Sequence, residues 1–220
     1  AGTMGTREAM TQLGHMAASI FRKGAGHKRV LVAIAGAPGA GKSTLSEDLL
    51  PLLPSGAAAI VQMDGFHHDN AVLEARGLLA RKGAPETFDF AGFRHALERL
   101  KTTDDEIALP VFDRKADLAR AGATVIGPQI RFVLVEGNYL LLDESPWYGL
   151  APLFDFSIFI DVPRGELAHR LVRRWVDHGL SQEAARERAF SNDMANAERV
   201  LAARREADLI FKPENETQAR

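Results

Sequence analysis

The 220-residue chain has 46% apolar and 25% charged residues and a formal net charge of −2. This composition is typical of a globular α/β protein. A nearly neutral chain creates no overall field that would hold nucleic acid, so nucleic acid is not an expected partner. The absence of Cys excludes disulfides and thiolate catalysis and favours a reducing compartment. We therefore expect one cytoplasmic domain over residues 1–220.

The N-terminal residues 6–23 mix apolar and polar side chains at helical spacing and lack the apolar run of a signal peptide. They predict an ordinary leading helix. The longest weakly polar stretch, 30–41, is too short to span a bilayer and contains Gly and Pro. We therefore expect no membrane insertion.

Short apolar runs followed by Gly or polar residues indicate interior strands at 30–35, 58–63, 132–135, 156–160 and 209–211. Segments with helical periodicity lie between them, at 43–53, 93–100 and 165–178. This alternation predicts a doubly wound, mainly parallel α/β sheet with helices on both faces. Ligands in such sheets bind at the carboxyl ends of the strands. The stretch 65–125 shows little strand signal and is interpreted as a substrate-facing insertion.

A glycine-rich motif directly follows the first strand and directly precedes a helix. It matches the G-x-x-x-x-G-K-[ST] pattern of a P-loop, reading Gly36-Ala37-Pro38-Gly39-Ala40-Gly41-Lys42-Ser43. In a P-loop, backbone amides and the helix N-terminus surround the phosphates of ATP. Lys42 would neutralise the β- and γ-phosphates, Ser43 would bind Mg²⁺, and Thr44 is assigned to the same nucleotide site. The pattern predicts a P-loop NTPase fold that binds ATP and Mg²⁺.

Two carboxylates end predicted strands and would open onto the same crevice. Asp64 could accept the proton of an acceptor hydroxyl as a general base, or it could be an exposed turn residue before Gly65. Glu136 resembles the Walker B position and could hold Mg²⁺, or it could cap the next turn. Asn138 and Tyr139 follow at the same rim and are assigned to the acceptor site.

The helix beginning near residue 165 carries arginines on one face. Arg170, Arg173 and Arg174 have the i, i+3, i+4 spacing of neighbours on a helix. They could form a solvated basic face. Alternatively, residues 164–205 could form a lid that closes over ATP and carries these arginines. We assign Arg170 and Arg174 to catalysis and Arg173 to nucleotide binding. The pair His67 and His68 lacks the spacing of a transition-metal site, so a substrate-rim or structural role is expected for His67.

From about residue 30 to 211 the chain resembles the uridine kinase, pantothenate kinase and phosphoribulokinase group of P-loop kinases. The most specific match is to bacterial pantothenate kinases, through Asp64-Gly65-Phe66, Asn70, Leu73, Arg76-Gly77-Leu78, Lys82-Gly83, Pro85-Glu86 and Asp89. This resemblance implies that Asp64 is the catalytic base. It also places Phe66 and Arg76 on the acceptor side.

Residues 110–113 resemble the P-x-Y-D segment of uridine kinases, whereas pantothenate kinases carry a Ser-His pair where this chain has Asp113-Arg114. Asp113 and Arg114 are therefore assigned to acceptor recognition. Residues 191–198 resemble a bacterial subgroup named as fructose transport system kinases. We expect a kinase that phosphorylates a hydroxyl of a small metabolite, with a sugar or polyol favoured. Nucleoside or pantothenate kinase activity and a transport-associated regulatory ATPase remain alternatives, and a homodimer is compatible with the sequence.

Overall fold

The computed structural model describes residues 2–214 and their side-chain surroundings from residue 7 onward. Its centre is a five-stranded sheet in the order β2-β5-β1-β6-β7, in which all neighbouring strands are parallel. The strands are β1 (Val30–Gly36), β2 (Ala58–Gln62), β5 (Phe132–Gly137), β6 (Phe156–Ile160) and β7 (Leu209–Phe211). The predicted doubly wound fold is therefore confirmed.

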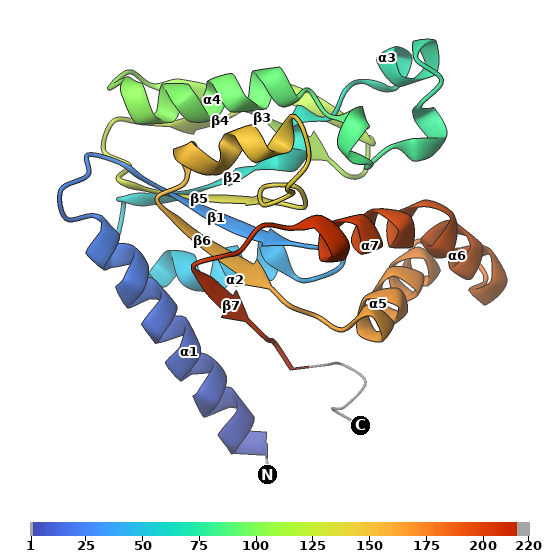
Figure 1. Ribbon diagram of the computed structural model, residues 1–220, viewed down its shortest axis with the longest axis horizontal. Helices are drawn as coiled ribbons and strands as arrows, with labels where there is room; N and C mark the ends of the chain where they lie inside the picture. Colours follow the sequence, from blue (N-terminus) through green and yellow to red (C-terminus); the bar gives the residue numbers. More distant parts are fainter. Residues whose placement is uncertain (1, 215–220) are drawn as a thin grey trace.

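Helices cover both faces of this sheet (Figure 1). The leading helix α1 (Gly2–Lys23) and the P-loop helix α2 (Lys42–Leu49), which continues into the 3₁₀ turn η1 (Leu50–Leu52), cover one face. Helix α4 (Phe90–Thr102) and the 3₁₀ segment η5 (Trp147–Leu153) cover the other. The expected helices are present, with ends that differ by a few residues.

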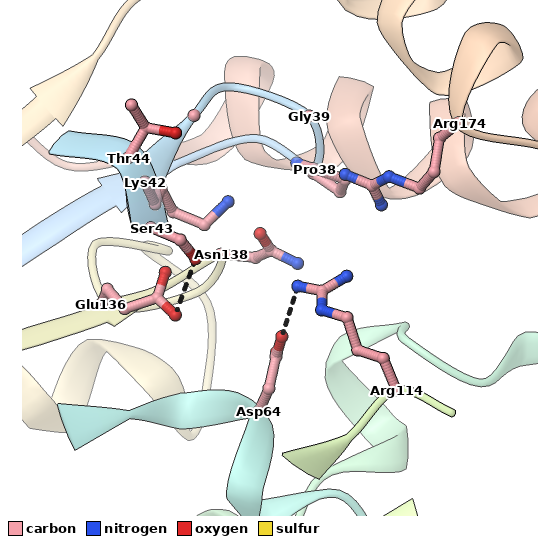
Figure 2. Close-up of a pocket in the computed structure, with 11 residues that line it drawn as sticks. Pro38, Gly39, Lys42, Ser43, Thr44, Asp64, Arg114, Glu136, Asn138 and Arg174 are labelled. Atoms are coloured by element: carbon pink, nitrogen blue, oxygen red, sulfur yellow. Dashed lines mark hydrogen bonds and ion pairs between the residues drawn. The ribbon is translucent and has the colours of Figure 1, made fainter. Parts of the chain in front are cut away.

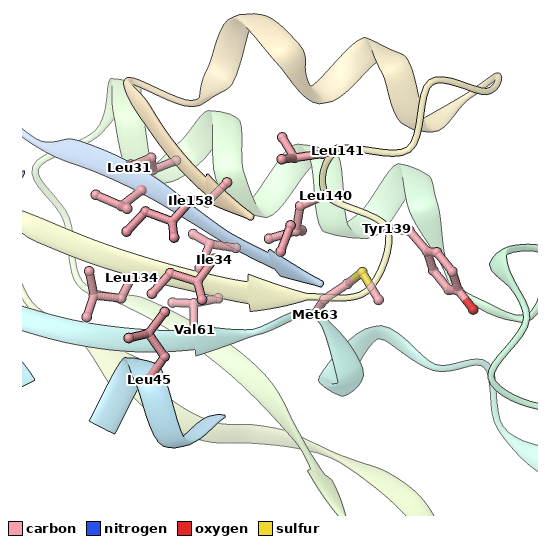
Figure 3. Close-up of a cluster of buried hydrophobic side chains, with 14 of the residues drawn as sticks. Leu31, Ile34, Leu45, Val61, Met63, Leu134, Tyr139, Leu140, Leu141 and Ile158 are labelled. Atoms are coloured by element: carbon pink, nitrogen blue, oxygen red, sulfur yellow. The ribbon is translucent and has the colours of Figure 1, made fainter. Parts of the chain in front are cut away.

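The central strands are buried on both faces, as their continuous apolar runs predict. Every residue of β1, β5 and β6 is buried. Figure 3 shows their side chains meeting those of α2 on one face and of the segment after β5 on the other. Because each fully buried Leu, Ile or Val contributes about 1.5–3 kcal/mol, this core fixes the strand ends rigidly. β2 and β7 lie at the sheet edges and are only partly buried, so the expectation that all five strands are interior was wrong.

Residues 65–125 also differ from expectation, because this segment contains two strands. β3 (Ile107–Asp113) and β4 (Leu118–Ile126) form an antiparallel hairpin separate from the main sheet. The register shifts between Leu109 and Val111, around Pro110, which cannot donate a ladder hydrogen bond. The rest of the segment holds α3 (Asn70–Ala75), the helix α4 described above, and three 3₁₀ turns, η2 (Met63–Phe66), η3 (Leu79–Arg81) and η4 (Pro85–Thr87).

The region after β6 is a helical layer at the carboxyl end of the sheet (Figure 1). It consists of α5 (Arg164–Asp177), α6 (Gln182–Arg188), a π-helical turn η6 (Ala189–Asp193) and α7 (Met194–Ala203). Within the described part of the chain, no helix is both long and apolar enough to cross a membrane.

Candidate active site

The P-loop has the backbone geometry that its sequence predicts. Gly39 and Gly41 have φ angles of +85° and +95°, in the left-handed region that side chains rarely adopt. Gly41 caps α2 without a side-chain hydrogen bond, and the helix begins at Lys42. The first-turn amides of α2 therefore have neither an intrahelical partner nor a capping side chain, and the helix N-terminus can receive an anion.

Lys42, Ser43 and Glu136 meet at the end of the P-loop (Figure 2). Ser43 Oγ donates to Glu136 Oε1 over 3.4 Å, and Glu136 is only 5% exposed. Burial raises the pKa of Glu136, while nearby Lys42 lowers it. Burial also lowers the pKa of Lys42 to about 8, although Glu136 and Asp64 oppose this shift. A hydroxyl beside a carboxylate is a hard oxygen donor set, so these residues fit the Mg²⁺ that the motif implies.

Asp64 faces this group from the other side of a cavity of about 280 Å³. It follows β2 on the turn η2, and its side chain is 30% exposed. Gly65 allows this turn to lie against the β3–β4 hairpin, because a Cβ there would come within 2.3 Å of the Pro110 carbonyl oxygen. The same cavity brings together P-loop residues, both carboxylates and three side chains from other segments: Pro38, Gly39, Gly41, Lys42, Ser43, Thr44, Asp64, Glu136, Arg114, Asn138 and Arg174.

The three arginines that the sequence assigns to a lid occupy different positions. Arg174 reaches the cavity, and within residues 7–214 its guanidinium has no hydrogen-bond or ion-pair partner. Arg170 instead packs on the P-loop, where Nη1 lies 3.3 Å from the carbonyl oxygens of Gly39 and Ala40 and Nε lies 3.1 Å from Glu166. Arg173 lines a second cavity. Of these three arginines, only Arg174 lines the smaller cavity between the P-loop and Asp64.

The second cavity, of about 680 Å³, adjoins the P-loop at Gly39, Ala40, Gly41 and Thr44. Its walls come from segments distant in the chain: Leu13 of α1, Ile160 of β6, Phe211 of β7, and the face of α5 that bears Arg170 and Arg173. Sequence reasoning missed Leu13, Ile160 and Phe211. Each belongs to an ordinary apolar pattern, so no local signal distinguished these residues from core.

Several residues predicted to bind the acceptor lie elsewhere. Tyr139 is fully buried, and its hydroxyl donates to the Gly83 carbonyl at 2.5 Å, so the structure does not bring it into the cavity. Phe66 is buried against Phe93. Of the residues predicted to bind the nucleotide, Gly36, Ala37 and Ala40 do not line the smaller cavity, and Ala40 lines the second cavity.

Two further residues assigned to the acceptor site, His67 and Arg76, do not line the smaller cavity. His67 packs between the tilted rings of Phe88 and Phe112, with ring centroids 4.1 and 4.5 Å away, and its Nδ1 donates to the Asp64 carbonyl over 2.7 Å. Burial lowers the pKa of His67. Arg76 contacts the ring of His68. Among the described residues, no group of three or more His, Asp or Glu side chains is placed to hold a metal ion.

A P-loop at the end of a buried parallel strand, with a Walker-B-like carboxylate and a second carboxylate across a small cavity, defines the class of P-loop phosphotransferases. Comparison with known proteins gives the family. Residues 31–218 match the model of the Phosphoribulokinase / Uridine kinase family, and the chain belongs to that family. Its members are kinases that phosphorylate hydroxyl groups, generally with ATP and Mg²⁺. This chain is therefore a phosphotransferase with an alcohol group as acceptor.

Individual relatives agree with this family. The chain is 48% identical to a solved structure named "putative fructose transport system kinase" from Silicibacter sp. TM1040, with a TM-score of 0.87 over 90% of this chain and 98% of that one. It is 41% identical to "Uncharacterized protein YggC" of Escherichia coli (strain K12), over 84% of this chain and 78% of the relative. It is 36% identical to "Putative uridine kinase C227.14" of Schizosaccharomyces pombe, over 77% of each.

Proposed function

We propose that this protein transfers the γ-phosphate of Mg-ATP to a hydroxyl of a small polyhydroxylated metabolite. The observation that carries the proposal is the single cavity in which Lys42, Ser43 and Glu136 face Asp64. Phosphoryl transfer requires positioning and charge stabilisation more than covalent chemistry from the protein. The P-loop amides and Lys42 form a phosphate-binding site, called the phosphate cradle below. This cradle lies opposite the half-buried carboxylate of Asp64, and the arrangement meets both requirements.

The residues on the nucleotide side hold and neutralise phosphate. The amides of the P-loop and Lys42 bind the phosphate oxygens, and Ser43 and Glu136 would hold Mg²⁺, which neutralises charge on the phosphates when it is bound. The apolar walls of the second cavity, including Leu13, Ile160 and Phe211, suit the nucleoside part of ATP because that cavity adjoins the P-loop. Residues 164–205 act as a lid through Arg174.

Asp64 acts on the acceptor. Its carboxylate accepts the hydroxyl proton while the oxygen forms a bond to the γ-phosphorus and the bond from that phosphorus to ADP breaks. The products are a phosphomonoester and ADP. Asn138, which lines the same cavity, can donate or accept hydrogen bonds and would orient the acceptor. Residues 65–125 supply the acceptor side together with Asp64. Asp64 lies on the turn η2 and Arg114 on the β3–β4 hairpin, and these two elements pack against each other at Gly65.

A sugar or related polyol is favoured over pantothenate, because Asp113-Arg114 replaces the Ser-His pair of pantothenate kinases. The name of the Silicibacter relative also mentions a fructose system. The test is ADP release with sugars, polyols, nucleosides and pantothenate, with an acceptor-free reaction as control. Strong activity on pantothenate or nucleosides alone would overturn the ranking. Rapid turnover that no acceptor increases would instead favour a regulatory ATPase.

A further inference from the structure

Arg114 has a position in the acceptor site that the reaction described above does not explain. It stands on the turn between β3 and β4 and points toward Asp64 (Figure 2). Asp113 builds this turn: its Oδ1 accepts hydrogen bonds of 3.0 Å from the backbone N–H groups of Lys115 and Ala116, and its Oδ2 lies 3.4 Å from Arg120 Nε. Asp113 therefore stabilises the turn, and Arg114, not Asp113, lines the cavity.

The contact between Arg114 and Asp64 is too loose to be the arginine's final partner. Arg114 Nη2 lies 3.9 Å from Asp64 Oδ2, beyond hydrogen-bond distance, and the Arg114 side chain is 66% exposed. Within residues 7–214 no other side chain or carbonyl binds this guanidinium. When the hydroxyl of an acceptor binds to Asp64, the Arg114 guanidinium remains beside it with its N–H donors free of that carboxylate. A guanidinium favours carboxylate or phosphate groups, which can accept two parallel hydrogen bonds from it.

The nucleotide does not account for Arg114. Lys42 and Arg174 already approach the phosphate position, and Arg174 lines both cavities, whereas Arg114 lines only the smaller one. Arg114 also lowers the pKa of Arg174, after the larger effect of burial, so the two cations disfavour each other until anions lie between them. An anion on the acceptor would satisfy Arg114 separately from the phosphates of ATP.

No other cation of the acceptor segment can take this role. Lys82 already has hydrogen-bond partners, because its Nζ lies 2.7 Å from both Asn70 Oδ1 and the Asp117 carbonyl oxygen. Arg76 contacts His68 instead of the cavity. Among the described residues of 65–125, Arg114 is the one cation that lines the cavity.

We propose that the acceptor is an acidic polyol, with its reacting hydroxyl on Asp64 and a carboxylate or phosphate group on Arg114. This inference rests on the proposed function and specifies its substrate class. Because Asp64 and Arg114 nearly touch, the hydroxyl and the acid group must lie within a few carbons of each other in a small molecule. The cavity of about 280 Å³ is consistent with an acceptor of that size.

The experiment compares matched acceptors that differ only in the acid group. Glycerate against glycerol and gluconate against sorbitol test a carboxylate; glycerol 3-phosphate against glycerol and ribose 5-phosphate against ribose test a phosphate. Steady-state kinetics are measured for the parent, Arg114→Gln and Arg114→Lys. Lys115→Gln is the control, because it removes one exposed positive charge from the same turn without touching the cavity.

We expect one acid class to exceed its neutral partners by about 10- to 100-fold in kcat/KM, the contribution of a charged hydrogen bond. Arg114→Gln should erase this preference by raising the KM of the acidic acceptor, while the KM of Mg-ATP and the rates on neutral acceptors stay near those of the parent. Arg114→Lys should recover part of the preference, and Lys115→Gln should keep all of it.

Three results would overturn the inference: neutral acceptors preferred by the parent, an acid preference retained in Arg114→Gln, or an equal loss of rate on neutral and acidic acceptors in that variant. The third result would place Arg114 on the transferred phosphate. If the parent neither phosphorylates nor, by calorimetry with a non-hydrolysable Mg-ATP analogue present, binds any acidic acceptor, the inference also fails. Failure of the proposed function would differ, because no acceptor, neutral or acidic, would then be phosphorylated or increase ATP turnover.

Discussion

The two sides of the cavity are built in different ways. The phosphate-binding part of the nucleotide side comes mainly from one continuous stretch, 36–44, between a fully buried strand and a helix, and Glu136 and Arg174 are added from elsewhere. The acceptor side combines Asp64, Arg114 and Asn138 from three separate segments, and Arg114 stands on an exposed hairpin turn. The phosphate-binding loop is thus held directly between two elements of the core, whereas acceptor recognition depends on loops that pack onto that core.

This difference implies that binding of Mg-ATP and transfer to the acceptor can be changed separately. Substitutions on the acceptor side should reduce transfer with little effect on nucleotide affinity. Substitutions in the P-loop should reduce both. The following variants test that separation, from the largest expected effect on activity to the smallest.

Asp64→Asn keeps the shape of the side chain and removes the proposed base. Transfer to the best acceptor should fall by about 10²- to 10⁴-fold, the usual contribution of general base catalysis. Steady-state ADP release with saturating acceptor measures this loss. Asp105→Asn, which changes an exposed carboxylate outside the cavity, is the matched control. Transfer at the parent rate in Asp64→Asn would remove Asp64 from the mechanism.

Arg174→Ala removes the lid cation that reaches the cavity. The expected loss is about 10²- to 10³-fold in kcat, similar to the loss of one preorganised donor to transition-state charge. The free energy of unfolding should change little, because the guanidinium has no hydrogen-bond partner within residues 7–214. Arg170→Ala should lower both activity and stability, since Arg170 binds Glu166 and the P-loop carbonyls.

Arg186→Ala, on α6 of the same lid, is the control for both variants and should keep parental activity. Kinetics and denaturant unfolding are measured side by side. If both Arg170→Ala and Arg174→Ala retained full catalysis, the arginines would be a solvated basic face and the lid assignment would be wrong.

Lys42→Ala removes the cation of the phosphate cradle. Affinity for Mg-ATP should fall by roughly 10²-fold, by analogy with loss of another preorganised charge donor, and transfer should fall with it. Equilibrium binding of Mg-ATP measures the first effect. Unchanged affinity together with unchanged turnover would contradict the assignment of the P-loop.

Asn192→Asp tests a link between the lid and the acceptor side and should have the smallest effect. Asn192 Nδ2 donates to the Lys82 carbonyl over 2.9 Å, and the next residue, Asp193, accepts from Trp175 Nε1 over 2.7 Å. The π-helical turn therefore joins α5 to the acceptor segment. An Asp at 192 cannot donate, and a lost hydrogen bond of about 1 kcal/mol predicts a change of only a few-fold.

The expected change in Asn192→Asp is an increase in acceptor-free ATP hydrolysis relative to transfer, because a lid that is held less firmly excludes water less well. Ser191→Ala, at the exposed neighbouring position, should leave this ratio unchanged. An unchanged ratio in Asn192→Asp would show that the turn is only a structural connection.

The sequence predicted the strand, loop and helix of residues 30–49 correctly because the signals are local. A buried strand, a glycine pattern and a helix start are contiguous, so their geometry follows from their order. The acceptor side was predicted less completely. β3 was missed because Pro110 interrupts it, and β4 was missed because Gly122 and exposed polar residues weaken its pattern.

Other features depend on contacts that no local pattern encodes. Tyr139 follows Asn138 in the chain, yet its ring turns into the core and its hydroxyl binds Gly83. The hydrogen bond from Asn192 to Lys82 joins residues 110 positions apart. The division of the chain into an acceptor segment at 65–125 and a lid at 164–205 stays a proposal that the variants above address.

The separation of the two sides is tested most directly by calorimetric titration of Mg-ATP into the parent, Asp64→Asn and Lys42→Ala under the same conditions. The account predicts that Asp64→Asn binds Mg-ATP within a few-fold of the parent, whereas Lys42→Ala binds it roughly 10²-fold more weakly. Equal losses of affinity in the two variants would contradict the account. They would place Asp64 with Ser43 and Glu136 on the magnesium side and leave the acceptor without its base.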